Sequence, residues 1–164
     1  MNFYKKYFDK LKENIFDYDE KKLNLFVKYL KQTKKNNKKV IIVGNGGSAA
    51  MASHVSVDLT KTCKIRSINF NEADLLTCFA NDYGYENWVK KAADFYADKN
   101  DLFICISSSG MSKNIINGAK QAKKSGCKVI TFSGFKKNNK LKKIGNVNFW
   151  VNSNNYNIVE MTHH

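Results

Sequence analysis

Four serine hydroxyls lie close together between residues 107 and 112, in the stretch SSSGMSKN. An apolar run that predicts a strand precedes this stretch, and a helical pattern follows it. The first turn of a helix offers unpaired backbone N–H groups and a partial positive charge, and serine hydroxyls add further donors. A helix cap explains one serine at such a place, but not four. We therefore expect a phosphate dianion to be held by Ser107, Ser108, Ser109 and Ser112.

A second loop, GNGGSA at residues 44–49, also follows an apolar run and opens a helical pattern. It fits the G-x-G-x-x-A pattern of dinucleotide-binding loops, although a tight turn that only packs helix on strand would look similar. Dinucleotide binding needs an acid at the end of the second strand, about 20 residues further on, to hold the ribose. Glu72 comes too late and already opens a helix, and no G-x-x-x-x-G-K-[ST] motif is present. A dinucleotide-dependent oxidoreductase is therefore the least favoured hypothesis.

Strand and helix patterns alternate along most of the chain, which predicts right-handed βαβ units and a mostly parallel sheet. Strands are expected at residues 39–44, 67–70, 101–109, 128–134 and 147–152. Helices are expected at residues 47–60, 73–80, 85–97 and 111–126, with two more between 2 and 36 and another opening at 156. The fold class is thus α/β, with a three-layer, doubly wound five-stranded sheet and an N-terminal helix pair. Ligands of such sheets bind beyond the carboxyl ends of the strands, where both loops lie.

The composition limits the classes of protein that this chain can be. Its 164 residues are 43% hydrophobic and show no linker or repeat, so we expect one domain with N-terminal helices over 1–37 and an α/β core over 38–164. No apolar run is long enough to span a membrane, and the charged, helical start is unlike a signal peptide. The four cysteines have no C-x-x-C spacing, so we expect reduced, mostly buried thiols in a cytoplasmic protein.

The formal net charge of +14 raises the hypothesis of nucleic-acid binding. The excess is almost all lysine, with Arg66 as the one arginine, whereas proteins that read base sequence rely on arginine in a groove. We therefore expect neither a nucleic-acid nor a membrane partner. The basic surface would still attract anionic substrates in a general way.

Three motifs taken in order, GNGGSAAMASH at 44–54, AND at 80–82 and ISSSGMSKN at 106–114, resemble the sugar isomerase (SIS) domain. The resemblance extends over about residues 1–162 and is strongest to the phosphoheptose isomerases. It implies a flavodoxin-like fold and conversion of sedoheptulose 7-phosphate to glycero-manno-heptose 7-phosphate, a step toward lipopolysaccharide or capsule precursors. It also implies a homotetramer whose active sites are shared between subunits.

The resemblance assigns a role to each motif. Asn45, Gly46, Gly47 and Ser48 would line the sugar site, Asn81 and Asp82 would contact the sugar chain, and the four serines would hold the phosphate. His54 would be a site residue and, in some members, a metal ligand. Asp58 falls where the family has a catalytic glutamate. The resemblance thus allows a zinc ion at His54 and Asp58, although the sequence itself requires no cofactor.

The spacing of His54 and Asp58 supports this pair independently, because residues four apart lie on one helix face. Aldose–ketose isomerisation moves a proton between C1 and C2 through an enediol, and it needs a base for that proton and an acid for the oxygens. A carboxylate suits the first role and a histidine the second. We therefore expect Asp58 to be the base and His54 an accessory acid, a sugar ligand or a metal ligand.

The sequence departs from the family pattern at several positions. Asp58 is one methylene shorter than the usual glutamate, and Met111 stands where asparagine is common. Val159 occupies the position of a family glutamine, and the family's second catalytic histidine would fall about two turns beyond it. His163 and His164 are the nearest candidates for that role, and His164 lies on roughly the same helix face, although a frayed end is the stronger explanation. These departures keep open the alternative of a non-catalytic SIS module that binds phosphosugars or serves assembly or regulation.

Overall fold

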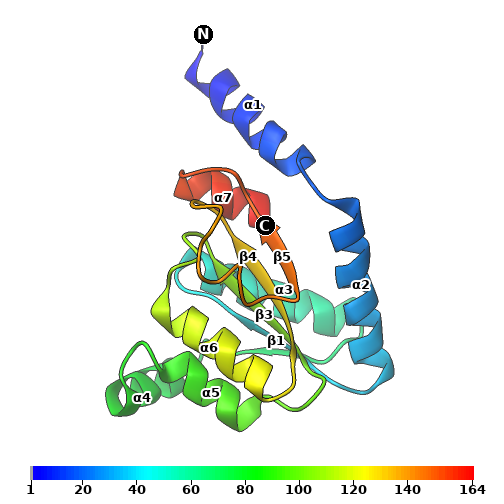
Figure 1. Cartoon of the computed structure of the whole chain (residues 1–164), viewed down its shortest axis with the longest axis vertical. Coiled ribbons are helices and arrows are strands. Elements are labelled where there is room, and N and C mark those ends of the chain that lie inside the picture. The colour runs from blue at the N-terminus through cyan, green and yellow to red at the C-terminus, as the bar shows by residue number, and fades with distance from the viewer. Residues whose placement is uncertain (1) are drawn as a thin grey trace.

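The computed structural model describes residues 2–164 and contains five strands, all parallel. They are β1 (Val40–Val43), β2 (Ser67–Asn69), β3 (Leu102–Ser107), β4 (Lys128–Ser133) and β5 (Val147–Trp150). The strand order is β2-β1-β3-β4-β5, so the chain winds outward in one direction from β1 and then in the other from β3. This arrangement (Figure 1) confirms the predicted doubly wound α/β fold and creates a switch point between β1 and β3, where ligands of such folds bind.

The described chain also contains seven helices (Figure 1). They are α1 (Phe3–Phe16), α2 (Glu20–Lys35), α3 (Gly47–Lys61), α4 (Ala73–Tyr83), α5 (Trp88–Tyr96), α6 (Lys113–Lys124) and α7 (Tyr156–His163). The helices predicted from apolar spacing are all present, with ends shifted by up to three residues. Gly126 follows α6 with a φ of +83°, which fits its predicted role in ending that helix.

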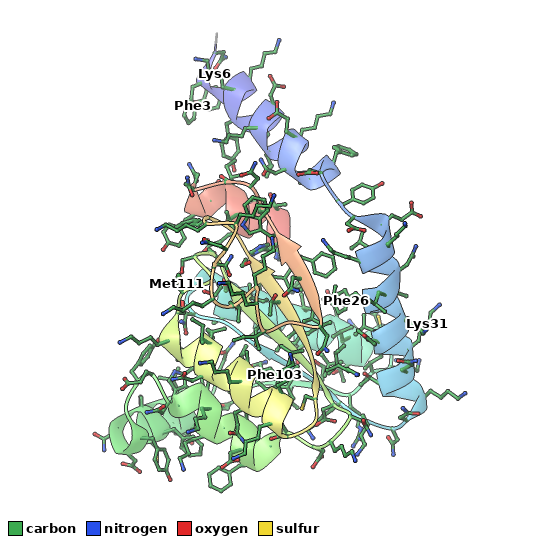
Figure 2. All side chains as sticks on the ribbon, viewed as in Figure 1. Phe3, Lys6, Phe26, Lys31, Phe103 and Met111 are labelled. Carbon is green, nitrogen blue, oxygen red and sulfur yellow. The ribbon has the colours of Figure 1, made fainter. Side chains whose placement is uncertain are left out.

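Each face of the sheet carries its own apolar core, because the side chains of a strand point alternately to opposite faces. Ile41, Phe103 and their neighbours pack with α4, α5 and α6, while Val40, Ile42 and Leu102 pack with α2 and α3. Figure 2 shows Phe26 pointing from α2 toward the sheet and Phe103 at the centre of the molecule. The two cores give the predicted three layers.

At the amino edge of the sheet, a buried carboxylate joins the start of β1 to the start of β3. Asp101 is fully buried just before β3. It accepts hydrogen bonds from the backbone N–H groups of Lys39 and Asp98, and the Lys39 ammonium lies 2.6 Å away. Burial by itself lowers the pKa of Lys39, but its hydrogen bonds to Asp101 and Asp98 outweigh that effect and raise it. The fold is thus fastened at the edge opposite the two motif loops.

The helix α1 lies apart from the sheet and buries none of its residues (Figure 1). Phe3, Tyr4, Phe8 and Phe16 are each more than 60% exposed, and Tyr7 of this helix donates a hydrogen bond to Asn157 of α7. Figure 2 shows Phe3 and Lys6 at its far end. An apolar helix face of this size is uncovered in the single chain.

One prediction about the cysteines was wrong. Cys105 and Cys127 are buried, but Cys63 and Cys78 are exposed. Cys63 falls in the turn after α3 and Cys78 on the outward face of α4, so neither reaches an apolar core. Burial raises the pKa of Cys105 and raises that of Cys127 to about 12, so both are thiols at neutral pH.

Candidate active site

The serine loop, residues 107–112, leaves β3 and opens α6 as predicted. Ser107 and Ser108 are buried, while Ser109 and Ser112 are half-buried. The hydroxyl of Ser107 donates to that of Ser112 over 3.0 Å, and the Met111 N–H donates to the Ser109 hydroxyl over 3.2 Å. Ser112 is the N-cap of α6 but makes no side-chain cap bond. Its hydroxyl and the first N–H groups of α6 therefore remain available to an anion.

The shape of the serine loop depends on contacts from the segment between β4 and β5. Gly110 has a φ of +63°, and a Cβ there would collide with the side chain of Asn139. The backbone N–H of Leu141 donates to the Gly110 carbonyl, and that of Gly134 to the Ser108 carbonyl. The loop is thus held in place from outside before any ligand arrives, which lowers the entropic cost of binding.

The glycine loop, residues 44–48, lies beside the serine loop at the switch point between β1 and β3. Asn45 and Asn114 join the two loops by a pair of amide hydrogen bonds, each side chain donating to the other over 3.0 and 2.8 Å. Asn114 is buried in the first turn of α6, and Tyr85 donates to Asn45 from the other side over 3.4 Å. The pair fixes the relative position of the predicted sugar and phosphate sites.

Gly44 and Ser48 have structural roles in the glycine loop. A Cβ at Gly44 would lie 2.6 Å from the backbone of Ser48, so only glycine lets α3 start this close to β1. Ser48 itself is buried. Gly46 has a φ of +55°, and with Gly47 it leaves the N-terminus of α3 open, without a side-chain cap. Gly46 and Gly47 are exposed and stand where the predicted sugar would lie.

His54, Asp58 and His164 form a second group, the histidine patch, on the outer face of α3. His54 Nε2 lies 3.4 Å from Asp58 Oδ2, with 66% and 58% of the two side chains exposed. The ring of His164 stacks on that of His54 with 6.0 Å between centroids. The structure thus places His164 beside His54, while a catalytic role for His164 stays a prediction. A cavity of about 360 Å³ lies here, lined by Gly47, Ala50, Met51, His54, Glu160, Met161 and His164.

Within the histidine patch, Asp58 lies far from the glycine loop. Asp58 comes eleven residues after Gly47, the first residue of α3, which places it about 16 Å along the helix axis. His54 and His164, by contrast, line the same cavity as Gly47. The predicted base is therefore the member of the patch that is set apart from the glycine loop within a single chain.

Asn81 and Asp82 lie on the last turn of α4 and are exposed. The Asn81 amide donates to Asp82 over 3.0 Å, and the Cys78 thiol lies 3.6 Å from the same carboxylate. The neighbouring Tyr85, rather than either predicted residue, contacts the glycine loop. Their assignment to the sugar site stays a prediction.

Residues in and directly after α7 lie in different surroundings. Val159, at the position of the family glutamine, is fully buried against Gly134 and carries no polar group toward the serine loop. His163 points inward, with its Nε2 within 3.2 Å of the Ser133 carbonyl. Burial lowers the pKa of His163 to about 4, although the hydrogen bond to Ser133 opposes this effect, so the ring is neutral at physiological pH. Only His164 of the two histidines reaches the histidine patch.

The predicted zinc ligands do not make a complete metal site. Residues 2–164 contain no group of three or more histidine, cysteine or carboxylate side chains arranged to hold a metal ion. His54 and Asp58 supply two donors, whereas catalytic zinc takes three protein ligands and structural zinc four. The residues of one chain therefore do not fit zinc, and no step of the chemistry is derived through it.

Several residues around the site carried no recognisable sequence signal. Asn114 lies within the quoted motif ISSSGMSKN, two residues after the last serine, and its buried polar side chain at a helix start was the one clue available. Asn139, Tyr85 and Glu160 reach the loops from distant parts of the chain. No local spacing predicts such contacts.

The sequence matches the SIS domain family over residues 3–134. The chain belongs to this family. The phosphoheptose isomerase of Aliarcobacter butzleri is 37% identical over 129 residues, which cover 75% of this chain and 68% of that protein. The enzyme of the same name from Campylobacter concisus is 38% identical over 118 residues, 68% of this chain and 62% of that protein. The matched segment thus spans about two thirds of the length of these curated relatives.

A phosphoheptose isomerase structure from Francisella tularensis superimposes with a TM-score of 0.86, covering 97% of this chain and 92% of that one. At 22% identity, this likeness concerns the fold. It confirms that the five-stranded sheet and the helices around it form the SIS fold. Within residues 2–164, no helix is both long and apolar enough to cross a bilayer.

Proposed function

We propose that this chain is a phosphosugar isomerase that interconverts a ketose phosphate and an aldose phosphate. The observation that carries the proposal is the Asn45–Asn114 amide pair, which joins a phosphate-binding serine loop to a glycine-rich sugar loop at the switch point of the sheet. The curated relatives are named phosphoheptose isomerases, and the resemblance to that family suggests the substrate: sedoheptulose 7-phosphate, converted to glycero-manno-heptose 7-phosphate. This reaction would belong to heptose biosynthesis in the cytoplasm.

The serine loop supplies binding energy and orientation in this proposal. Its hydroxyls and the first N–H groups of α6 hold the phosphate as charge-assisted hydrogen-bond donors. Because the loop is supported by Asn139 and Leu141, a bound phosphate fixes the far end of the sugar. Much of the rate enhancement of such a reaction comes from holding the reacting carbons beside the catalytic groups.

The proton transfers are assigned to the histidine patch. A base takes a proton from C1 of the ketose while an acid protonates the C2 carbonyl oxygen, giving an enediol. The proton is then delivered to C2 and the O1 hydroxyl loses its own, which gives the aldose with no net change in atoms or electrons. Asp58 is the base in this scheme and His54 the acid, with His164 stacked on His54.

The distance between Asp58 and the glycine loop makes self-association part of the proposal. Asp58 lies about 16 Å along α3 from this loop, so the histidine patch of one chain would serve the serine loop of another. The uncovered aromatic face of α1 supports association between copies, and the resemblance to the family suggests a tetramer. The partners are therefore a phosphorylated sugar and further copies of this chain.

The decisive experiment supplies sedoheptulose 7-phosphate in D₂O to the purified chain and follows the sugar by NMR. We expect an aldoheptose phosphate to form with deuterium at C2, because an enediol exchanges its proton with solvent. Asp58→Ala should bind the sugar phosphate but not convert it. Binding without turnover by the unaltered chain, together with unchanged binding by Asp58→Ala, would contradict the catalytic assignment.

A non-catalytic module that binds phosphosugars is the second candidate. The buried Val159 favours it, because this position offers no polar group to a substrate. The two candidates predict the same binding and differ in the deuterium experiment. Substitution of Ser107 and Ser109 should strongly weaken binding under either.

A further inference from the structure

The cavity of about 360 Å³ that α3 and α7 line brings the glycine loop and the histidine patch together. From α3 come Gly47 and His54, which are seven residues apart and so lie on one helix face. From the other side come Glu160 of α7 and His164, whose backbone N–H donates to the Glu160 carbonyl and continues the helical turn. The ionisable side chains of the cavity are thus one carboxylate and two imidazoles, the groups that general acid–base catalysis uses most.

The carboxylate of Glu160 lies directly against the glycine loop. Its two oxygens are 3.0 and 3.3 Å, and its carboxyl carbon 3.2 Å, from the position that a Cβ would take on Gly47. Only glycine at this position lets the carboxylate come so close to the loop where the sugar is expected. Asp58, by contrast, is not among the described residues that line this cavity.

Glu160 is a half-buried acid without a partner. Among the carboxylates of residues 2–164, only Asp101 and Glu160 are not exposed. Asp101 accepts two backbone hydrogen bonds and pairs with the Lys39 ammonium. Within the described residues, the Glu160 carboxylate accepts no hydrogen bond and enters no ion pair. Partial burial of an unpaired charge costs free energy, and such a group is a candidate for a functional role.

The proposed isomerisation leaves one proton without an acceptor. Asp58 takes the proton from C1, and His54 gives a proton to the oxygen at C2. To reach the aldose, the O1 hydroxyl must also lose its proton, and His54 must regain the one that it gave. A carboxylate in the same cavity as His54 can accept a proton from a hydroxyl and then, as a carboxylic acid, donate it.

We propose that Glu160 is a catalytic residue that takes the O1 proton of the enediol and returns it to His54. This inference rests on the proposed function and adds the group that completes its proton transfers. As the O1–H bond breaks, its electron pair forms the C1 carbonyl, and the C1–C2 double-bond pair takes the proton held by Asp58 onto C2. The proton on Glu160 then passes to the neutral His54, so all three residues return to their starting states.

This transfer does not depend on which copy of the chain holds the phosphate. Glu160 and His54 line one cavity of one chain, so they reach the substrate together.

The test follows sedoheptulose 7-phosphate with the whole purified chain in D₂O by NMR and compares two signals. One is deuterium at C1 of the recovered ketose, which reports enediol that returned, and the other is the aldose. Glu160→Gln keeps the shape but cannot take a proton. Its enediol still forms through Asp58 and His54, so the ratio of C1-deuterated ketose to aldose should rise by about a hundredfold.

The ratio is measured within one sample, so a loss of folded protein does not change it. Glu20→Gln is the matched control, because it makes the same change at an exposed position in the first turn of α2. It should show the ratio of the unaltered protein.

The outcomes separate the two proposals. An unchanged ratio in Glu160→Gln, whether both signals persist or both fall, would overturn the role of Glu160 and leave the isomerase standing. Neither exchange nor aldose with the unaltered protein would overturn the proposed function, and the role of Glu160 with it.

Discussion

The serine loop and the histidine patch differ in how firmly the fold holds them. The serine loop is buried, bonded to the glycine loop through Asn45 and Asn114, and supported from the β4–β5 segment by Asn139. The histidine patch consists of exposed side chains on one helix face, with one contact of 3.4 Å and one ring stack. The proposed phosphate site is therefore prepared by the single chain, while the proposed catalytic side chains depend on what covers them.

The largest effect is expected at Asp58. Asp58→Asn keeps the size of the side chain and removes the base, so turnover should fall by about a thousandfold. Phosphate affinity should not change, because the serine loop lies between β3 and α6, whereas Asp58 lies in the last turn of α3. Steady-state kinetics and a phosphate titration of the same preparation check both expectations. Equal losses of binding and turnover would mean that the two regions are not separate.

The next largest effect is expected when hydroxyls are removed from the serine loop, which should weaken binding rather than catalysis. Ser107→Ala combined with Ser109→Ala should weaken phosphosugar binding by about a hundredfold, because each hydrogen bond to a charged group contributes about 1.5 kcal/mol or more. Isothermal titration calorimetry measures the loss. Replacing Ser125, a serine that ends α6 far from the loop, is the matched control and should leave affinity intact. An unaltered affinity in the double variant would show that the phosphate does not bind at this loop.

The adjacent histidines of α7 should differ in their response to acid. His163 has a folded-state pKa of about 4 against an ordinary value of 6.5, so the unfolded chain binds more protons between these values. Stability should therefore be unaffected above pH 6.5 and fall by about 2 kcal/mol between pH 7.5 and pH 5. Denaturant titrations across this range measure the slope. His163→Leu should flatten it, whereas His164→Leu, a change in the exposed patch, should not.

The smallest expected effect is a difference in the free energy of unfolding between variants of the two regions. Asn114→Ala removes a buried side chain and leaves the Asn45 amide without its partner, which should lower the free energy of unfolding by about 1 to 2 kcal/mol. His54→Ala removes an exposed side chain and should change it by less than about 0.5 kcal/mol. Chemical denaturation compares the two variants. A larger loss in His54→Ala would show that the patch is structural.

Much of the fold could be predicted because its signals are local. Runs such as VIIV in β1 are apolar at every position, as strands buried on both faces must be, and the helix patterns between them repeat at helical spacing. The placement of both motif loops at the carboxyl edge followed from the parallel topology. The direction of α1 did not follow, because this helix buries none of its residues and touches the rest of the chain mainly at α7.

The sequence proposed candidate site residues where short motifs contained them, and it missed the residues that reach the two loops through long-range contacts. The four serines and His54 with Asp58 stand in short patterns whose spacing has a physical meaning. The bond from Asn45 to Asn114 joins residues 69 positions apart, and Glu160 reaches Gly47 from α7. The exposure of Cys63 and Cys78 was misjudged for the same reason, since burial is decided by tertiary packing rather than by residue type.

The carboxylate of Asp101 at the amino edge has a consequence for how this protein can change over evolution. Asp101 and Lys39 hold β1 and β3 together at one edge of the sheet. The loops at the other edge therefore do not have to hold these strands together on their own. Replacements of exposed residues in these loops, unlike those of Gly44, Gly110 or Asn114, alter which ligand is held and in which orientation at little risk to the fold. Ligand specificity thus depends on the carboxyl edge of the sheet, where mutations are better tolerated, and the stability of the fold depends on the amino edge.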